Sequence, residues 1–409
     1  MSLVGAAGEL LLRAVLNPLF LVLVLVVAWQ YKRMQRLSEG LFALERNIYV
    51  RSTVISTLAG VAGGAVGALV LIALGIDLSR IGIVYLFLTA LTLMLFHPRY
   101  LCFAYAGGIV SLFSLLSGAG DIDVPQLMAL VGVLHMVEAL LILLTGWLDP
   151  MPVYVRREGE AEVVGGFNLQ KFWPIPLVAV MGVAQVSGPG VEVSPLARPE
   201  WWPLLHLGPG SADSLAYMLV PVLAILGYGE VATTAPPRRK VVSSAGHLAL
   251  FSAVLVLLAL GAALVPSLVW VPALFGPLGH ELLIWVGLRQ ESRGEAIYRH
   301  PGHGVMVLDV LPGSLAARAG IRSQDVVLAV NGMGVRDRLD LYYALQAAST
   351  RLDIDILRAH DIIYASLERR PRQVLGIIPV PEPGTDRFIV LRDDTFITRA
   401  ARALQRLLP

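Results

Sequence analysis

Long apolar runs constrain the fold of this chain more than any other feature of its sequence. Apolar residues make up 56% of the 409 residues, charged residues only 15%, and the mean hydropathy is +0.70. A soluble core cannot hide so large an apolar excess, so much of the chain must use the lipid bilayer as its solvent. The sequence therefore predicts a polytopic α-helical membrane domain over residues 1–290.

The expected membrane domain contains about eight or nine spans, of which Phe172–Val186 is shorter and broken by Pro174 and Pro176. The segments are Leu16–Tyr31, Val54–Ile76, Ile81–Phe96, Leu101–Leu116, Leu127–Trp147, Phe172–Val186, Ala212–Glu230, His247–Val265 and Leu268–Leu288. Gly60, Gly63, Gly64 and Gly67 in the second segment suit close helix packing in lipid. The basic segment Lys32–Arg51 has apolar residues at helical spacing and predicts an amphipathic helix at the cytoplasmic interface.

The last apolar segment decides on which side the C-terminal part lies. Leu268–Leu288 contains Pro272 and Pro277, so it either crosses the membrane or re-enters it. A full crossing places the C-terminal part in the cytoplasm, and a re-entrant segment places it outside. The arginines that follow the segment favour the cytoplasm, because basic loops stay inside.

Residues 302–332 have the pattern of a small soluble recognition domain. A Gly-X-Gly loop precedes an alternating strand, a Pro-Gly-Ser turn leads into a short Ala-rich helix ended by Gly320, and the strand VVLAV ends at Asn331-Gly332. This pattern resembles a PDZ domain of the bacterial arrangement, except that Gln324 stands where that pattern has a glycine. The resemblance implies a small α+β domain over residues 295–372.

The same resemblance implies where a peptide would bind. A partner's C-terminal tail would add as a strand beside the first strand, with its carboxylate on the amides of the Gly-X-Gly loop. The expected peptide-binding residues are Gly302, His303, Gly304 and Val305, with Arg299 as a charge partner and Leu341 and Leu345 on the groove helix. The alternative is that the two glycines only form a turn and that the groove is closed, occupied internally or unused.

Residues 373–409 form a tail with two expected elements. A Pro-rich linker leads to a short strand at Phe388–Leu391, and Thr395–Leu408 predicts a basic amphipathic helix. That helix would lie on anionic lipid or a partner, or dock on its own domain.

His280 and Glu281 raise the question of proteolysis. A His-Glu pair near a PDZ-like domain is similar to the site-2-type intramembrane zinc proteases, which need HExxH so that two histidines bind zinc while the glutamate activates water. Ile284 stands where the second histidine is required. The chain is therefore expected not to be an enzyme, and an inactive relative that regulates proteolysis stays an alternative. The ordinary interpretation of Glu281 is a residue at a helix start.

Two other features carry candidate chemistry. His135 and Glu138 share a helix face at membrane depth, which suits a proton relay in a transporter-like protein with a regulatory PDZ domain, or a polar pair that locks helices together. The single cysteine, Cys102, lies in an apolar run, so neither a disulfide framework nor a cysteine-based metal site is expected. No cofactor, metal or nucleic acid is expected.

The layout of the whole chain resembles the MinJ-like division-site determinants of Gram-positive rods, which are polytopic membrane proteins ending in one PDZ domain. The residues that carry the resemblance are Glu9–Arg33, Gly276–Glu281 and the PDZ-like core. The resemblance implies a non-enzymatic scaffold in the bacterial cell membrane, at the septum and poles. It would bridge a DivIVA-type protein and a MinD-type protein of the division machinery. Whether the chain forms a homo-oligomer stays open.

Overall fold

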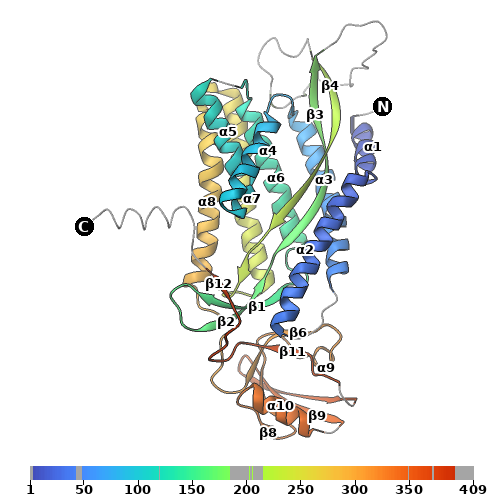
Figure 1. Ribbon diagram of the computed structural model, residues 1–409, viewed down its shortest axis with the longest axis vertical. Helices are drawn as coiled ribbons and strands as arrows, with labels where there is room; N and C mark the ends of the chain where they lie inside the picture. Colours follow the sequence, from blue (N-terminus) through green and yellow to red (C-terminus); the bar gives the residue numbers. More distant parts are fainter. Residues whose placement is uncertain are drawn as a thin grey trace, which may run out of the picture.

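The chain folds into an elongated body of helices with a small mixed domain at one end, as the computed structural model shows (Figure 1). It describes residues 3–42, 48–118, 120–184, 202, 205, 215–348, 350–370 and 373–391. The expected tail helix at Thr395–Leu408 lies outside the described residues.

Four helices of the described chain are long and apolar enough to cross a membrane. They are α3 (Tyr49–Leu74), α6 (Val124–Thr145), α7 (Pro237–Leu264) and α8 (Trp270–Arg293), the last preceded by the short turn η2 (Pro266–Leu268). A fifth crossing arises if α1 (Leu3–Val15) and α2 (Pro18–Phe42), which meet at 59°, count as one bent span. Helix α6 lies inside the bundle, since 72% of its apolar window is buried.

Two of the expected spans are helices that are too short to cross the hydrocarbon core of a bilayer. Helix α4 (Ile83–Phe96) has 14 residues and α5 (Phe103–Ser117) has 15, and the turn η1 (Pro98–Leu101) joins them. At 1.5 Å per residue they reach about 21–23 Å, short of the ~30 Å hydrocarbon core. The prediction of a separate interfacial helix at Lys32–Arg51 is also wrong, because the first part of this segment continues α2 without a break to Phe42.

Two further expected helical spans are β-strands. Strand β3 (Lys171–Ala184) pairs antiparallel with β4 (Leu215–Tyr228) over their full length of 14 residues each. The prediction of helices at Phe172–Val186 and Ala212–Glu230 is therefore wrong. The prolines explain the outcome, since proline inside a helix removes a hydrogen bond and clashes with the preceding turn. The hairpin runs alongside α3 (Figure 1).

The prolines of the hairpin fall at positions whose N–H groups would point away from the paired strand. Pro174 and Pro176 alternate along β3, and Pro221 lies opposite Val178, the next position of the same set. Proline has no N–H, so these positions add no orphan donors in apolar surroundings. Their carbonyl oxygens lie against α3, where a Cβ on Gly60 or Gly64 would overlap the carbonyl of Pro174 or Pro176. Because neither glycine has a side chain, the backbone of β3 can pack directly against α3 at these two positions.

The loop after α3 satisfies the outer edge of β3 further along. The Leu78 N–H donates to the Val180 carbonyl oxygen (2.9 Å), and the Gly182 N–H donates to Asp77 Oδ1 (2.8 Å). Backbone groups without water must find such partners inside the protein. The hairpin is thus held to the helical body by its backbone as well as by its side chains.

A small sheet closes the end of the helical body next to the C-terminal domain. Its strand order is β12-β1-β2-β5, formed by β1 (Met151–Arg157), β2 (Val163–Asn168), β5 (Val231–Ala232) and β12 (Ile389–Leu391). Strand β12 lies where the tail strand is expected and pairs parallel with β1.

The C-terminal domain has the expected α+β composition. Its elements are β6 (Val305–Val310), α9 (Leu315–Arg318), β7 (Val326–Val330), β8 (Met333–Gly334), α10 (Arg338–Ala347), β9 (Arg351–Arg358), β10 (Asp361–Glu368) and β11 (Ile377–Pro379). The sheet order is β10-β9-β7-β6-β11, with β8 paired to β7. Strand β11 extends the domain beyond the expected boundary at residue 372.

Candidate functional site

The turns of the C-terminal domain form where the sequence motif predicts them. Gly302 and Gly304 have φ of 80° and 82°, and Asn331-Gly332 has φ of 50° and 77°, the left-handed region that favours glycine and asparagine. The Asp337 side chain caps α10 by accepting from the Asp340 N–H (2.8 Å). Local sequence signals thus account for the turns of this domain and for the start of α10.

Gln324, which replaces the glycine of the PDZ pattern, has the left-handed backbone conformation that a glycine would adopt there. Gln324 has φ of 74°, a conformation that strains a residue with a Cβ. The next residue, Asp325, is 1% exposed and accepts two hydrogen bonds from Arg358 (2.7 and 2.8 Å). These bonds and the carboxylate charge raise the pKa of Arg358. The ion pair fastens the start of β7 to the end of β9.

The expected docking edge for a peptide is not free. Strand β6 pairs antiparallel with β7 on one side and with β11 on the other. A tail cannot add beside Val305 while β11 is in place. A Cβ on Gly304 would lie 2.7 Å from Val326 Cγ1, so the absence of a side chain at Gly304 lets β7 approach. His303 is exposed, and Arg299 forms an ion pair with Glu162 (3.7 Å).

The last strand of the sheet on this side is β11, which faces the groove helix α10. Leu375, just before β11, is buried in one apolar cluster with Leu341 of α10, and Leu345 packs on the same cluster. At the other end, the Arg338 N–H donates to Glu382 Oε1 (2.7 Å) and holds the first turn of α10 beside the chain after β11. Strand β11 is therefore the edge strand of the sheet next to α10.

The sequence contains a signal for β11, although the same residues resemble a linker to the tail. Val374-Leu375-Gly376-Ile377 places one glycine before a short apolar strand, and Gly376 has φ of 81°. The prolines of the following PVPEPG run hide the strand from periodicity arguments. Of the expected peptide-binding residues, Leu341 and Leu345 of α10 pack in the same apolar cluster as Leu375, next to this strand.

The C-terminal domain is fixed to the small sheet of the helical body. The Tyr154 hydroxyl of β1 donates to the Pro379 carbonyl oxygen (2.9 Å). The linker after α8 is held as well, since Gly165 donates its N–H to the Tyr298 carbonyl (2.9 Å). Leu308 and Ile378 belong to the same buried cluster as Tyr154. The domain therefore does not hang from a free linker.

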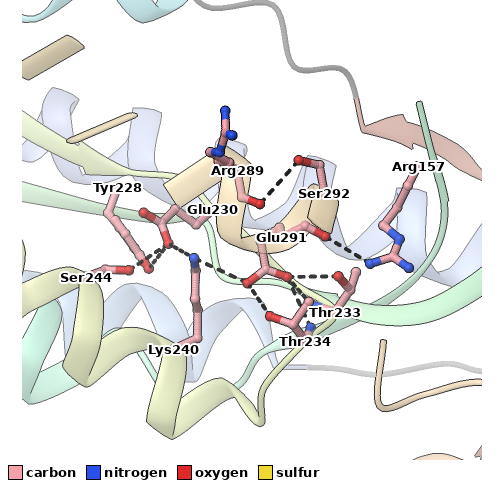
Figure 2. A network of polar contacts seen from close by, with 10 residues as sticks. All are labelled: Arg157, Tyr228, Glu230, Thr233, Thr234, Lys240, Ser244, Arg289, Glu291 and Ser292. Atoms are coloured by element: carbon pink, nitrogen blue, oxygen red, sulfur yellow. Dashed lines mark hydrogen bonds and ion pairs between the residues drawn. The ribbon is translucent and has the colours of Figure 1, made fainter. Parts of the chain in front are cut away.

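A buried polar network secures the point where α8 leads into that linker (Figure 2). The Glu291 carboxylate accepts from the N–H and hydroxyl groups of Thr233 and Thr234 at 2.7–3.1 Å and pairs with Lys240 (3.3 Å). Arg157 of β1 donates to the Glu291 carbonyl oxygen (3.1 Å). Because both charges of the Glu291–Lys240 pair are compensated, the network ties α7, α8, β1 and β5 into one unit.

The polar residues expected at membrane depth gather differently from the prediction. His135 meets His280 across two helices, with ring centroids 5.2 Å apart, rather than forming a pair with Glu138. Glu138 lies half-buried on α6. Glu281 lies in the middle of α8, so its assignment to a helix start is wrong. It accepts from Arg99 (2.8 Å) and from the Tyr105 hydroxyl (2.5 Å).

The sequence interpretation missed Arg99, Tyr105 and Cys102 as members of this cluster. Arg99 lies in η1, between two short apolar helices, and its partner Glu281 is 5% exposed. Cys102, expected to take no part in a ligand cluster, has its Sγ 3.1 Å from His135 Nε2. The available signal was the shortness of the two apolar segments on either side of η1.

The fold and site define a protein with membrane-length helices that carries a C-terminal PDZ domain. The family model for the PDZ domain matches residues 306–358. Beyond that class, the chain is similar to the cell division topological determinant MinJ of Bacillus subtilis, with 24% identity over 235 residues, 55% of this chain and 54% of that protein.

The chain is also similar to the mitochondrial serine protease HTRA2 of Drosophila yakuba, with 38% identity over 68 residues, 17% of this chain and 16% of that protein. The chain thus aligns with about half the length of MinJ and a much smaller part of HTRA2. These similarities support a MinJ-like protein with a C-terminal PDZ domain, and the short HTRA2 match brings no protease activity with it.

Proposed function

We propose that this chain is a non-enzymatic membrane scaffold that recruits protein partners through its PDZ domain and takes part in placing the division site. The observation that carries the proposal is a PDZ domain fixed to a body of membrane-length helices in a chain similar to a cell division topological determinant. Partners of the DivIVA and MinD type, and enrichment at septum and poles, belong to the proposal.

Charge distribution supports a cytoplasmic PDZ domain. The end of the helical body that carries this domain gathers the basic side chains of α2, α3, α7 and α8: Lys32, Arg33, Arg36, Arg51, Arg238, Arg239, Arg289 and Arg293. The opposite end carries Asp77, Asp121 and Asp123 beside Arg80. Basic residues flanking membrane helices remain in the cytoplasm.

The groove between β11 and α10 is the proposed docking place. A peptide that adds along β11 would gain main-chain hydrogen bonds, and its side chains would meet Leu341 and Leu345. The proposed binding residues are therefore Leu375, Ile377 and those of α10, in place of the Gly-X-Gly loop.

Matched variants of the full-length membrane protein test this groove. Ile377→Glu and Leu345→Glu place a charge in the groove and are expected to weaken partner capture at least tenfold. Tyr364→Glu serves as control, since Tyr364 is 76% exposed on β10 at the far edge of the sheet. Membrane insertion is measured in parallel. Equal capture by all three variants would refute the groove assignment.

A fluorescent fusion in a dividing rod-shaped host tests the cellular part. Septal and polar enrichment is expected, and it should decrease with Leu345→Glu while membrane signal persists. A uniform membrane signal would remove the division-site proposal. Glu281→Gln distinguishes the protease alternative, because loss of substrate cleavage in this variant would contradict a non-enzymatic scaffold.

A further inference from the structure

We propose a metal-binding site inside the helical body, formed by Cys102, His135 and His280. The three residues come from different helices: Cys102 is the N-cap of α5, His135 lies midway along α6, and His280 lies on α8. Their ligand atoms all lie within 4.8 Å of one another. The site is independent of the PDZ groove and of the proposed recruitment function.

The distances match the edges of a tetrahedral metal site. Cys102 Sγ lies 3.1 Å from His135 Nε2 and 3.5 Å from His280 Nε2. Zinc bonds of about 2.3 Å to sulfur and about 2.0 Å to nitrogen give a tetrahedral S···N edge of about 3.5 Å. Both sulfur–nitrogen distances therefore lie within ~0.4 Å of the edge of a tetrahedral Zn²⁺ site.

A backbone hydrogen bond orients His135 as a ligand. Its Nδ1 lies 2.7 Å from the Val131 carbonyl oxygen, and a carbonyl only accepts, so Nδ1 carries the proton. The lone pair of Nε2 then points at Cys102. A histidine that donates its other ring N–H to a carbonyl is the arrangement that fixes metal-binding histidines in proteins.

Hydrogen bonding alone leaves His280 unsatisfied. The thiol has one proton, which it donates to His135 Nε2. If His280 donates from Nε2 to the sulfur, its Nδ1 lone pair is buried without a partner among the described residues. If the proton is on Nδ1, two lone pairs face each other. A cation accepts the lone pairs of the sulfur and both Nε2 atoms at once, and a borderline-soft divalent ion such as Zn²⁺ suits this sulfur and nitrogen set. His280 Nδ1 then carries a proton that has no acceptor among the described residues, so His135 is the better oriented of the two histidines.

The surroundings of the three residues favour a bound cation. The nearby carboxylate of Glu281 is not available as a ligand, because it already has other partners. The Ala104 N–H points at the sulfur (3.4 Å) from the start of α5, and a helix N-terminus stabilises negative charge there. Phe251 packs on both imidazoles. Glu281 is engaged by Arg99 and Tyr105. The ion would pin the turn between α4 and α5 to α6 and α8.

The single cysteine gives a direct test on the unmodified, detergent-solubilised full chain. Cys102 alkylation is followed by mass after chelator treatment and after addition of Zn²⁺. We expect Zn²⁺ to slow alkylation at least tenfold and chelator to restore the rate. An alkylation rate that ignores Zn²⁺ would overturn the proposal, since no other thiol exists in the chain.

Variants identify the ligands. Wild type should bind about one Zn²⁺ per chain, and Co²⁺ should give a sulfur-to-metal charge-transfer band. Cys102→Ser should remove the band, and His280→Ala should lower Zn²⁺ affinity at least tenfold. His247→Ala is the matched control, because His247 is exposed on α7. Equal Zn²⁺ affinity for His280→Ala and His247→Ala would refute the site.

Discussion

Alanine at Gly64 tests whether a β-strand lies against α3. A Cβ there would overlap the Pro176 carbonyl oxygen and come within 3.1 Å of Ile175 Cγ2. A backbone carbonyl in a paired strand cannot rotate away as a side chain can, so the cost falls at the upper part of the ~1–3 kcal/mol range for overpacking. Alanine also gains about 1 kcal/mol over glycine in a helix. The expected net destabilisation is about 2 kcal/mol.

The assay is thermal unfolding of the detergent-solubilised chain. About 2 kcal/mol corresponds to a fall of about 4–8 °C in Tm for a domain of 150–250 residues, so a fall of about 4 °C is expected for this larger helical body. Gly60→Ala should behave like Gly64→Ala, and the double variant should cost less than the sum, because one displacement of the hairpin relieves both overlaps. Gly63→Ala should cost less, since the three atoms nearest to its Cβ all belong to the flexible Leu141 side chain, the closest at 3.0 Å.

Gly246→Ala on α7 is the matched control, because nothing lies within 4 Å of a Cβ at that position. It should leave Tm unchanged or raise it. If Gly64→Ala is as stable as Gly246→Ala, then α3 does not contact the strand, and the reasoning from the proline carbonyls fails.

Three further changes have defined outcomes. Gln324→Gly should relieve the left-handed strain and stabilise the PDZ domain by about 1 kcal/mol, seen as slower amide hydrogen exchange in the full chain; unchanged exchange would contradict it. Lys240→Met should destabilise the helical body by about 3–5 kcal/mol in thermal unfolding because Glu291 stays buried without its counter-ion, and a wild-type Tm would show that the threonines suffice. Arg358→Met should speed exchange in β7 and β9 by leaving Asp325 buried and uncompensated, whereas Arg351→Met, with an exposed ion pair, should not.

The C-terminal domain was predictable because its signals are local. Turn glycines, the Asn331-Gly332 pair and the Asp337 cap each act within a few residues. The position of β11 was not predictable in this way. It joins the sheet beside β6 from about 70 residues further along the chain, and no local pattern reports such a pairing.

The prediction for the apolar part of the chain was wrong where it depended on composition alone. Phe172–Val186 and Ala212–Glu230 are as apolar as true spans, and the hydropathy of a segment does not distinguish a strand from a helix in lipid. Pro174 and Pro176 carried the missing information, because two prolines at alternate positions suit the edge of a strand better than any helix. The candidate metal cluster is beyond such reasoning, since its three residues are distant in sequence.

The fixed attachment of the PDZ domain to the helical body limits which partners a scaffold of this kind would bind. Tyr154, the linker contact at Tyr298 and the pairing of β12 with β1 hold the domain at one height and rotation above the helical body. A domain on a flexible linker would search a volume set by linker length. A fixed domain instead holds β11 and α10 at one distance from the helical body, so under the proposed function only a partner tail that reaches this distance would bind. Tail length would then contribute to selectivity along with tail sequence.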